Sequence, residues 1–183
     1  MIHPSINMKK FSIIVLSLVL FAACNNADKE TGSSETATET STPAATESRP
    51  APMPSFAMMN SRNETVNLES FKGKKVFVNL WATWCGPCRA EIPSIQQLVA
   101  KTNPEKVAIV MLSLDDDFET AKDFASKTKM NLPVYFPAGQ LPILFTVEAI
   151  PTTFIFNEKG ELIHRQVGAD NYDSPAYIEL LNK

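Results

Sequence analysis

The 183 residues carry a formal net charge of −3 and a pI near 5.4. They contain no cluster of Lys and Arg, which argues against nucleic acid as a partner because phosphate binding needs such a cluster. The apolar content of 44% is ordinary for a packed soluble domain, and the length allows one such domain with additional segments.

The first segment has the pattern of an export signal. Lys9 and Lys10 precede an apolar run over residues 11–23, which is too short for a transmembrane helix of about 20 apolar residues. The run closes with the letters LFAAC on Cys24 and resembles the lipobox of bacterial lipoproteins. We therefore expect a lipoprotein signal peptide at residues 1–23 and lipid attachment at Cys24. A plain signal peptide followed by an incidental thiol is the alternative.

The next segment, residues 24–52, is rich in Thr, Ser, Ala, Glu and Pro and shows no apolar periodicity. Such a composition cannot bury enough apolar surface to offset its ordering entropy, so it predicts a disordered linker. With the lipid anchor, the linker would hold a domain at residues 53–183 in the cell envelope. The domain would lie outside the cytoplasm on a bacterial membrane, with the periplasm as the expected compartment.

From residue 53 onward, strand-like and helix-like segments alternate. The periodicity of apolar residues predicts these elements in chain order: a small leading hairpin within 55–68, a strand at 75–80, a helix at 88–102, a strand at 107–114, a helix at 118–129, a strand at 132–136, a short helix at 141–147, a hairpin of strands 152–157 and 162–167, and a helix at 172–181. This order predicts an α/β fold, a mixed central sheet with helices on both faces.

The strongest chemical signal is the pair Cys85 and Cys88 in the sequence WCGPC, between a predicted strand and a predicted helix. At a helix N-terminus, free backbone N–H groups stabilise a thiolate and can lower a cysteine pKa from about 8.5 to roughly 3.5–7.5. The spacing leaves Cys88 within one helical turn, where it can resolve a mixed disulfide formed by Cys85. The motif thus predicts a redox-active disulfide and no other cofactor.

Two other uses of the cysteine pair are possible on the residues alone. It could form a static disulfide, or half of a zinc site, although zinc needs two further ligands and the predicted domain offers only His164. The rival function is correspondingly a binding module, either a metal-binding chaperone or a docking protein that does not turn over. No metal site is expected.

Residues 76–93, read as VFVNLWATWCGPCRAEIP, resemble the TlpA/ResA-like branch of the thioredoxin superfamily, and the resemblance extends over about residues 51–183. It implies a thioredoxin-like fold with a central insertion at residues 115–145. It also implies a membrane-anchored thiol–disulfide oxidoreductase that exchanges disulfides with partner protein thiols. The resemblance favours a protein-disulfide reductase, for example of the apocytochrome c maturation type, that a membrane electron donor keeps reduced.

The resemblance also assigns roles to residues around the cysteines. Ile150 and Pro151 match the superfamily loop in which a cis-proline faces the disulfide, and a cis peptide would expose the Ile150 backbone to an extended substrate. Glu91 matches an acid that lies beside the active cysteines and moves a proton; an exposed acid in the first helical turn is the alternative. Asn79 stands where many thioredoxins carry a buried proton-relaying Asp, which strengthens the case for Glu91.

The remaining residues near the motif receive weaker interpretations. Substrate contact is expected at Trp84, Gly86 and Pro87. We expect Trp81 either to flank the site or to pack in the core, and Thr83 and Arg89 to be exposed neighbours of the cysteines. Residues 115–117 are expected to form a solvated strand end and helix cap. His164 is expected to be a surface or structural histidine.

Overall fold

The computed structural model describes residues 50–183. The predicted signal peptide, Cys24 and nearly all of the predicted linker lie outside the described residues. The elements in chain order are β1 (Ala57–Asn60), β2 (Thr65–Asn67), the 3₁₀ turn η1 (Leu68–Phe71), β3 (Lys75–Trp81), α1 (Gly86–Ala100), β4 (Val107–Ser113), α2 (Phe118–Thr128), β5 (Val134–Pro137), the 3₁₀ turn η2 (Ile143–Phe145), β6 (Thr152–Phe156), β7 (Leu162–Val167) and α3 (Pro175–Asn182).

Seven strands form one mixed sheet in the order β2-β1-β5-β4-β3-β6-β7. β3 pairs in parallel with β4, and β4 in parallel with β5. The other neighbours are antiparallel, including the predicted leading hairpin β1–β2 and the predicted hairpin β6–β7. The strand β3, which leads into the cysteines, is therefore central and paired on both sides.

The two faces of the sheet bury different side chains of the same strand. Phe77 of β3 belongs to the core beneath the α-helices, whereas Val76 and Val78 belong to the core on the opposite face. This alternation is the period of two that a β-strand imposes on its side chains. Every residue of β3 and of β4 is buried, which explains why both strands are largely apolar in the sequence.

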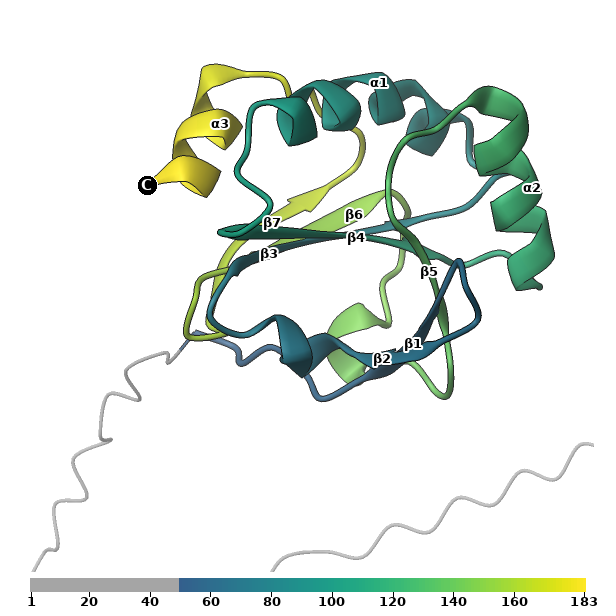
Figure 1. Cartoon of the computed structure of the whole chain (residues 1–183), viewed down its shortest axis with the longest axis horizontal. Helices are drawn as coiled ribbons and strands as arrows, with labels where there is room; N and C mark the ends of the chain where they lie inside the picture. The colour runs from purple at the N-terminus through teal and green to yellow at the C-terminus, as the bar shows by residue number, and fades with distance from the viewer. Residues whose placement is uncertain (1–49) are drawn as a thin grey trace, which may run out of the picture. The chain divides into compact units, whose positions relative to one another are not determined.

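All three α-helices pack against one face, contrary to the expectation of helices on both faces. Their buried side chains join a single core with β3 and β4, and Figure 1 shows α1 and α3 on the same side of the sheet. The other face is covered by the N-terminal segment from Met53, the β1–β2 hairpin, η1 and η2. The predicted helix at 141–147 forms only the three-residue turn η2 because Pro142 fixes an extended backbone immediately before it.

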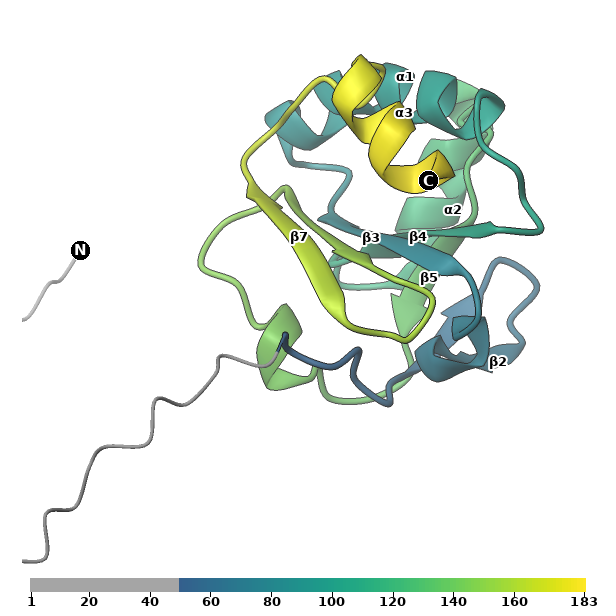
Figure 2. The ribbon, with the colours of Figure 1, turned by 90° about the vertical axis from the view of Figure 1, so that its left-hand side faces the viewer.

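The final helix begins later than predicted. Tyr172 lies in a turn and is fully buried, and α3 starts at Pro175 with Ser174 in the preceding N-cap position. Proline is favoured in the first turn of a helix, where its missing N–H has no partner to lose. Figure 2 shows the connection from β7 rising from the sheet to the layer that contains α1 and α3.

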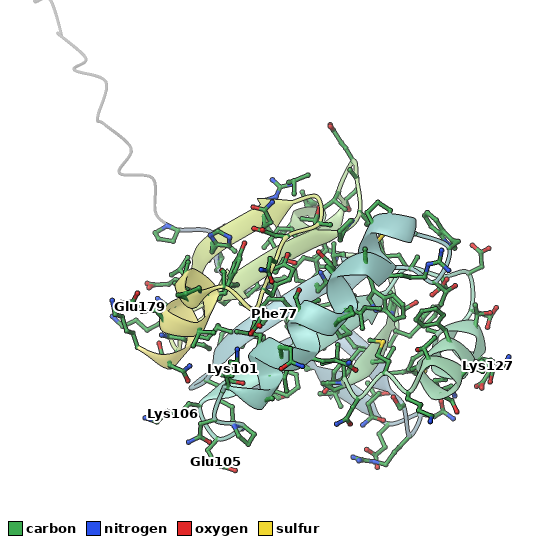
Figure 3. All side chains as sticks on the ribbon, turned by 90° about the horizontal axis from the view of Figure 1, so that it is seen from above. Phe77, Lys101, Glu105, Lys106, Lys127 and Glu179 are labelled. Atoms are coloured by element: carbon green, nitrogen blue, oxygen red, sulfur yellow. A yellow bond between two sulfur atoms is a disulfide. The ribbon has the colours of Figure 1, made fainter. Side chains whose placement is uncertain are left out.

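Among the described residues, Lys75, Glu91 and Asp115 are buried, and the other charged side chains lie at the periphery of the domain. Figure 3 shows this contrast from the helix side, with Phe77 inside and Lys106, Lys127 and Glu179 projecting outward. Within residues 50–183, no helix has the length and apolar character needed to cross a membrane.

Candidate active site

The cysteine pair lies where the central strand ends and the first helix begins. Cys85 is the N-cap residue of α1, and its sulfur is 3.2 Å from the backbone N of Cys88. The two sulfurs form a disulfide with an S–S distance of 2.04 Å. Cys85 retains 6% of its surface and Cys88 only 1%, so Cys85 is the more accessible of the two.

The loop before β6 approaches the disulfide from the other side. The peptide bond between Ile150 and Pro151 is cis, as the resemblance predicted. The sulfur of Cys85 lies 3.7 Å from the carbonyl oxygen of Ile150, a contact because a disulfide sulfur carries no hydrogen. Residues 65 positions apart in the chain are thereby brought together at one edge of the site.

An apolar groove borders the disulfide. Trp84 is 67% exposed beside Cys85, and Gly86 and Pro87 are exposed as well. Trp84 and Ile150 line a groove of about 290 Å³ together with side chains from the segment around η2. Trp84 and Gly86 are the chain neighbours of Cys85 and Ile150 contacts its sulfur, whereas substrate contact by the five residues stays a prediction.

Glu91 is buried, which excludes the alternative of an exposed acid in the first turn of α1. Its exposed fraction is 3%, and it follows Cys88 by three residues, so both project from the same side of the helix. One carboxylate oxygen accepts from Asn79 Nδ2 at 2.7 Å, and the other accepts from the Asp170 N–H at 3.2 Å.

Burial raises the pKa of Glu91 from 4.5 to about 7, against the opposing effect of the two hydrogen bonds. Desolvation penalises the charged form of an acid, and here it outweighs the donors that favour the carboxylate. A group with a pKa near 7 can both accept and release a proton near neutral pH. The side chain beside the resolving cysteine is therefore suited to proton transfer.

Sequence comparison identifies the family. Residues 48–181 match the Redoxin family profile. The chain belongs to the Redoxin family. The thiol-disulfide oxidoreductase ResA of Bacillus thuringiensis (strain Al Hakam) is 31% identical over 116 residues, which cover 63% of this chain and 67% of that protein. The sporulation thiol-disulfide oxidoreductase A of Bacillus subtilis (strain 168) is 29% identical over 128 residues, covering 68% and 77% respectively.

A solved structure agrees with these relatives. The crystal structure of a putative thiol:disulfide interchange protein DsbE from Chlorobium tepidum superposes with a TM-score of 0.61 at 31% identity, covering 73% of this chain and 92% of that chain. This Redoxin protein therefore has the thioredoxin-like fold and is a ResA-like thiol–disulfide oxidoreductase, as the resemblance over residues 76–93 implied.

Two interpretations of polar residues in this Redoxin domain were wrong. Asp115, expected to be solvated, is buried and accepts from the N–H and hydroxyl of Thr83 and from the hydroxyl of Ser113. Thr83 is correspondingly half-buried and held in place rather than a free exposed neighbour. Asp115 thus fixes the loop that leads into Cys85. Asp117 caps α2 as expected, accepting from the Thr120 N–H.

The two tryptophans of the motif have different environments. Trp81 is fully buried and packs against Phe124 of α2, so it is a core residue and Trp84 alone is exposed at the site. Arg89 is exposed as expected. His164 is half-buried on β7, with its ring edge-on to Tyr177, in agreement with a structural role.

Sequence reasoning missed three residues that complete the surroundings of Glu91. Thr153 accepts from Asn79 Nδ2 at 2.9 Å, and the hydroxyl of Tyr172 lies 2.6 Å from that of Thr153. Asp170 supplies the backbone donor to Glu91. The position of Thr153 could have been predicted from the sequence, because it closely follows the cis-proline on a strand that pairs with Asn79. Asp170 and Tyr172 gave no signal because they lie in a loop far along the chain.

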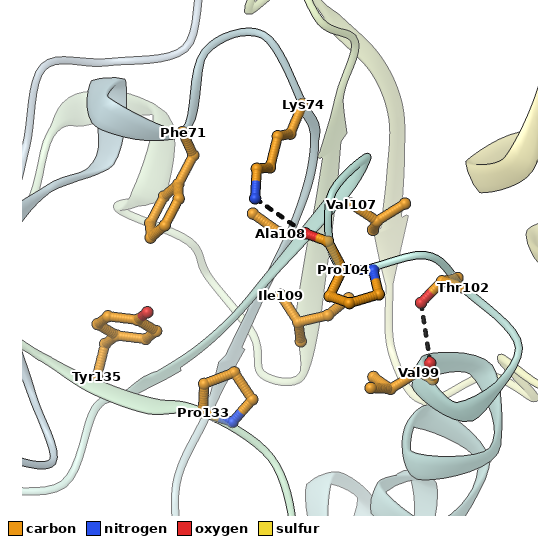
Figure 4. A pocket seen from close by; sticks show the side chains of 10 residues that line it. All are labelled: Phe71, Lys74, Val99, Thr102, Pro104, Val107, Ala108, Ile109, Pro133 and Tyr135. Carbon is orange, nitrogen blue, oxygen red and sulfur yellow. Dashed lines mark hydrogen bonds between the residues drawn. The ribbon is translucent and has the colours of Figure 1, made fainter.

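A second cavity in the domain is separate from the cysteine site. A cavity of about 350 Å³ between η1, β4, β5 and the end of α1, shown in Figure 4, contains neither cysteine nor any predicted site residue. In residues 50–183, no group of three or more His, Cys, Asp and Glu side chains is arranged to hold a metal ion.

Proposed function

We propose that this protein reduces disulfides of partner proteins outside the cytoplasm, held to a membrane by a lipid on Cys24. The observation that carries the proposal is the arrangement around the disulfide: Cys85 at a helix N-terminus facing the cis-proline loop, with the buried acid Glu91 one turn beyond Cys88. The names of the relatives support thiol–disulfide exchange as the reaction. No bound cofactor is needed, because the cysteines themselves carry the electrons.

In the reduced protein, Cys85 is the attacking residue. It is the more accessible sulfur, and the Cys88 N–H in the first turn of α1 points toward it and stabilises its thiolate. The thiolate attacks one sulfur of the partner's disulfide. A mixed disulfide forms between that sulfur and Cys85, and the partner's other sulfur leaves as a thiolate that takes up a proton.

Cys88 completes the reaction. Its thiol gives a proton to the Glu91 carboxylate, and the resulting thiolate attacks Cys85 to form the internal disulfide. The second partner sulfur leaves and is protonated. Two electrons and two protons have then passed from the protein's dithiol to the partner, which becomes a dithiol.

The backbone of Ile150 provides a docking edge for the partner. In the described part of the chain, neither its N–H nor its carbonyl is paired with another backbone group. An extended segment that carries the partner's cysteine can pair with it, as a strand adds to a sheet edge. The apolar groove beside Trp84 then accommodates a neighbouring side chain.

The reducing direction rests on Gly86 and Pro87, the pair found in reducing thioredoxins, and on the resemblance to TlpA/ResA-like proteins. A membrane electron donor would regenerate the dithiol, and apocytochrome c is the type of partner that the resemblance favours. A reduction potential more negative than about −200 mV is expected for a reductant. A clearly more positive value would contradict the direction.

Trapping in cells tests the function. Cys88→Ala leaves Cys85 able to attack but removes the thiol that resolves the mixed disulfide, so partner proteins should accumulate on Cys85 and be released by dithiothreitol. The matched control is the double variant with Cys85→Ser, which should capture none of them. Equal adducts on both variants, or none on either, would contradict disulfide exchange with protein partners.

A further inference from the structure

The loop between β7 and α3 supplies one side of the Glu91 environment. The Asp170 N–H donates to a Glu91 carboxylate oxygen at 3.2 Å, and Ser94 of α1 lies beside the same loop, accepting from the Tyr172 N–H at 3.1 Å. The reaction described above uses the cysteine side of Glu91 and leaves this loop without a role.

An opening leads from this loop to Glu91. It has a volume of about 370 Å³ and is lined by Ala90, Glu91, Ala169, Asp170 and Asn171. Neither cysteine lines it, nor does Ile150 or Pro151. The small side chains of Ala90 and Ala169 leave the space open, and water needs both such room and polar partners. The backbone and side chain of Asp170 provide those partners.

The Asp170 carboxylate has a fixed position at this opening. It accepts from the hydroxyl of Tyr177 on α3 at 2.7 Å, and that hydroxyl lies 3.4 Å from Nε2 of His164 on β7. A negative charge held close to Glu91 opposes the ionisation of Glu91, while the Asp170 N–H favours it. One residue therefore acts on Glu91 in two opposing ways.

We propose that Asp170 adjusts the protonation of Glu91 and that the opening beside it is the route by which the Glu91 proton reaches solvent. This inference rests on the proton role proposed for Glu91. In the step itself, the neutral carboxyl gives one proton to water in the opening and becomes a carboxylate held by Asn79 and the Asp170 N–H. No electrons move. Asp170 is a positioning residue, since it acts on the sulfurs only through Glu91.

Few other charged groups face Glu91. The titratable ones are Cys88 on the same helix, Asp170 and Tyr172 in the loop, and Tyr177 on α3. The neighbours on β3 and β6, Asn79 and Thr153, do not titrate. Among the residues that the structure describes, no Lys or Arg forms an ion pair with Glu91. Substitution of Asp170 is therefore the way to change the charge close to Glu91.

The electrostatic part is tested with Asp170→Asn. This change keeps the backbone N–H and an oxygen that can accept from Tyr177, but it removes the negative charge. In the oxidised full-length protein, the ¹³C resonance of the Glu91 carboxyl should then titrate at a lower pH than in the parent. The matched control is Asp173→Asn, an acid of the same loop that pairs with Lys101, and it should leave the midpoint in place. An unchanged midpoint in Asp170→Asn, or an equal shift in both variants, would overturn the proposal.

The route is tested with Ala169→Leu, which fills the opening with an exposed side chain. Cys85 is first converted to its mixed disulfide with thionitrobenzoate, and the release of that coloured thiolate by Cys88 is followed. Ala169→Leu should slow the release several-fold, and it should have no further effect in a Glu91→Gln background, where no carboxyl proton has to leave. Equal slowing in both backgrounds would overturn the route. Because the adduct is made chemically, this result does not depend on whether proteins are the natural substrates.

Discussion

A buried acid with a raised pKa leaves a signature in the pH dependence of folding. Between pH 4.5 and 7, folded Glu91 keeps its proton while the unfolded chain has lost it, so the folded state becomes less favoured as the pH rises. At about 1.4 kcal/mol per pKa unit, the contribution lost across this window is roughly 3 kcal/mol. The site therefore carries a destabilising group at neutral pH.

Glu91→Gln removes this titration. We predict that the free energy of unfolding of the variant relative to the parent is higher at pH 8 than at pH 4, by up to roughly 3 kcal/mol. Urea unfolding of the oxidised proteins measures it, because the disulfide-bonded cysteines do not titrate. Glu105→Gln, at an exposed acid, is the control and should show the parent's profile. If the difference in the free energy of unfolding between Glu91→Gln and the parent did not vary with pH, the claim that Glu91 is buried and protonated would be contradicted.

At the scale of single residues, the roles of the two cysteines were easier to predict from the sequence than the surroundings of Glu91 and Asp115. The roles of Cys85 and Cys88 follow from the local sequence. The motif places Cys85 at the start of the helix, where its thiolate is stabilised, and leaves Cys88 within one turn, where it can resolve the mixed disulfide. The environment of Glu91 depends on Asp170, 79 positions away, and nothing in the local sequence marks that loop. Asp115 was misassigned because its partner Thr83 is 32 positions earlier, in the loop that follows the neighbouring strand β3.

At the scale of elements, the loop between β3 and α1 determines where Cys85 lies. That loop is fixed to the end of β4 by one carboxylate, which satisfies the backbone and hydroxyl donors of Thr83 and the hydroxyl of Ser113. Buried donors that lose their acceptor cost on the order of 1–3 kcal/mol. The position of the attacking sulfur thus depends on the neighbouring strand.

Asp115→Ala should lower the stability of the domain by about 2 kcal/mol, within the range for buried donors left unpaired. The release of the loop should also increase the rate at which iodoacetamide alkylates Cys85 in the reduced protein. Urea unfolding and timed alkylation measure the two effects. Asp116→Ala, at the exposed neighbouring acid, should change neither. Equal effects of the two substitutions would show that Asp115 has no special part in holding the loop.

The strands were predicted more closely than the helix ends and the short turns. Fully buried strands such as β3 and β4 are largely apolar in sequence, and their bounds were within one residue of the prediction. The segment at 141–147 contains apolar residues at helical spacing, but Pro142 limits it to one 3₁₀ turn. Placing all three α-helices on one face required knowing that the N-terminal segment covers the other, which spacing does not reveal.

At the scale of the whole molecule, the sheet brings together groups from distant parts of the chain. The ends of β3 and β4, the start of β6 and the loop after β7 all meet at the N-terminus of α1. One end of the domain therefore contains the disulfide, the cis-proline loop, the buried acid and the opening to solvent. The residues that carry the exchange chemistry are thus gathered at one end of the sheet, and the predicted anchor and linker would determine where they act.

The central claim is that Cys85 is the nucleophile of a thiol–disulfide oxidoreductase, and insulin reduction tests it most directly. The full-length protein, kept reduced by dithiothreitol, should accelerate the precipitation of insulin B chains. Cys85→Ser should return the rate to that of dithiothreitol alone, while Cys24→Ser, which leaves the active pair intact, should match the parent. Full activity in Cys85→Ser would contradict the account.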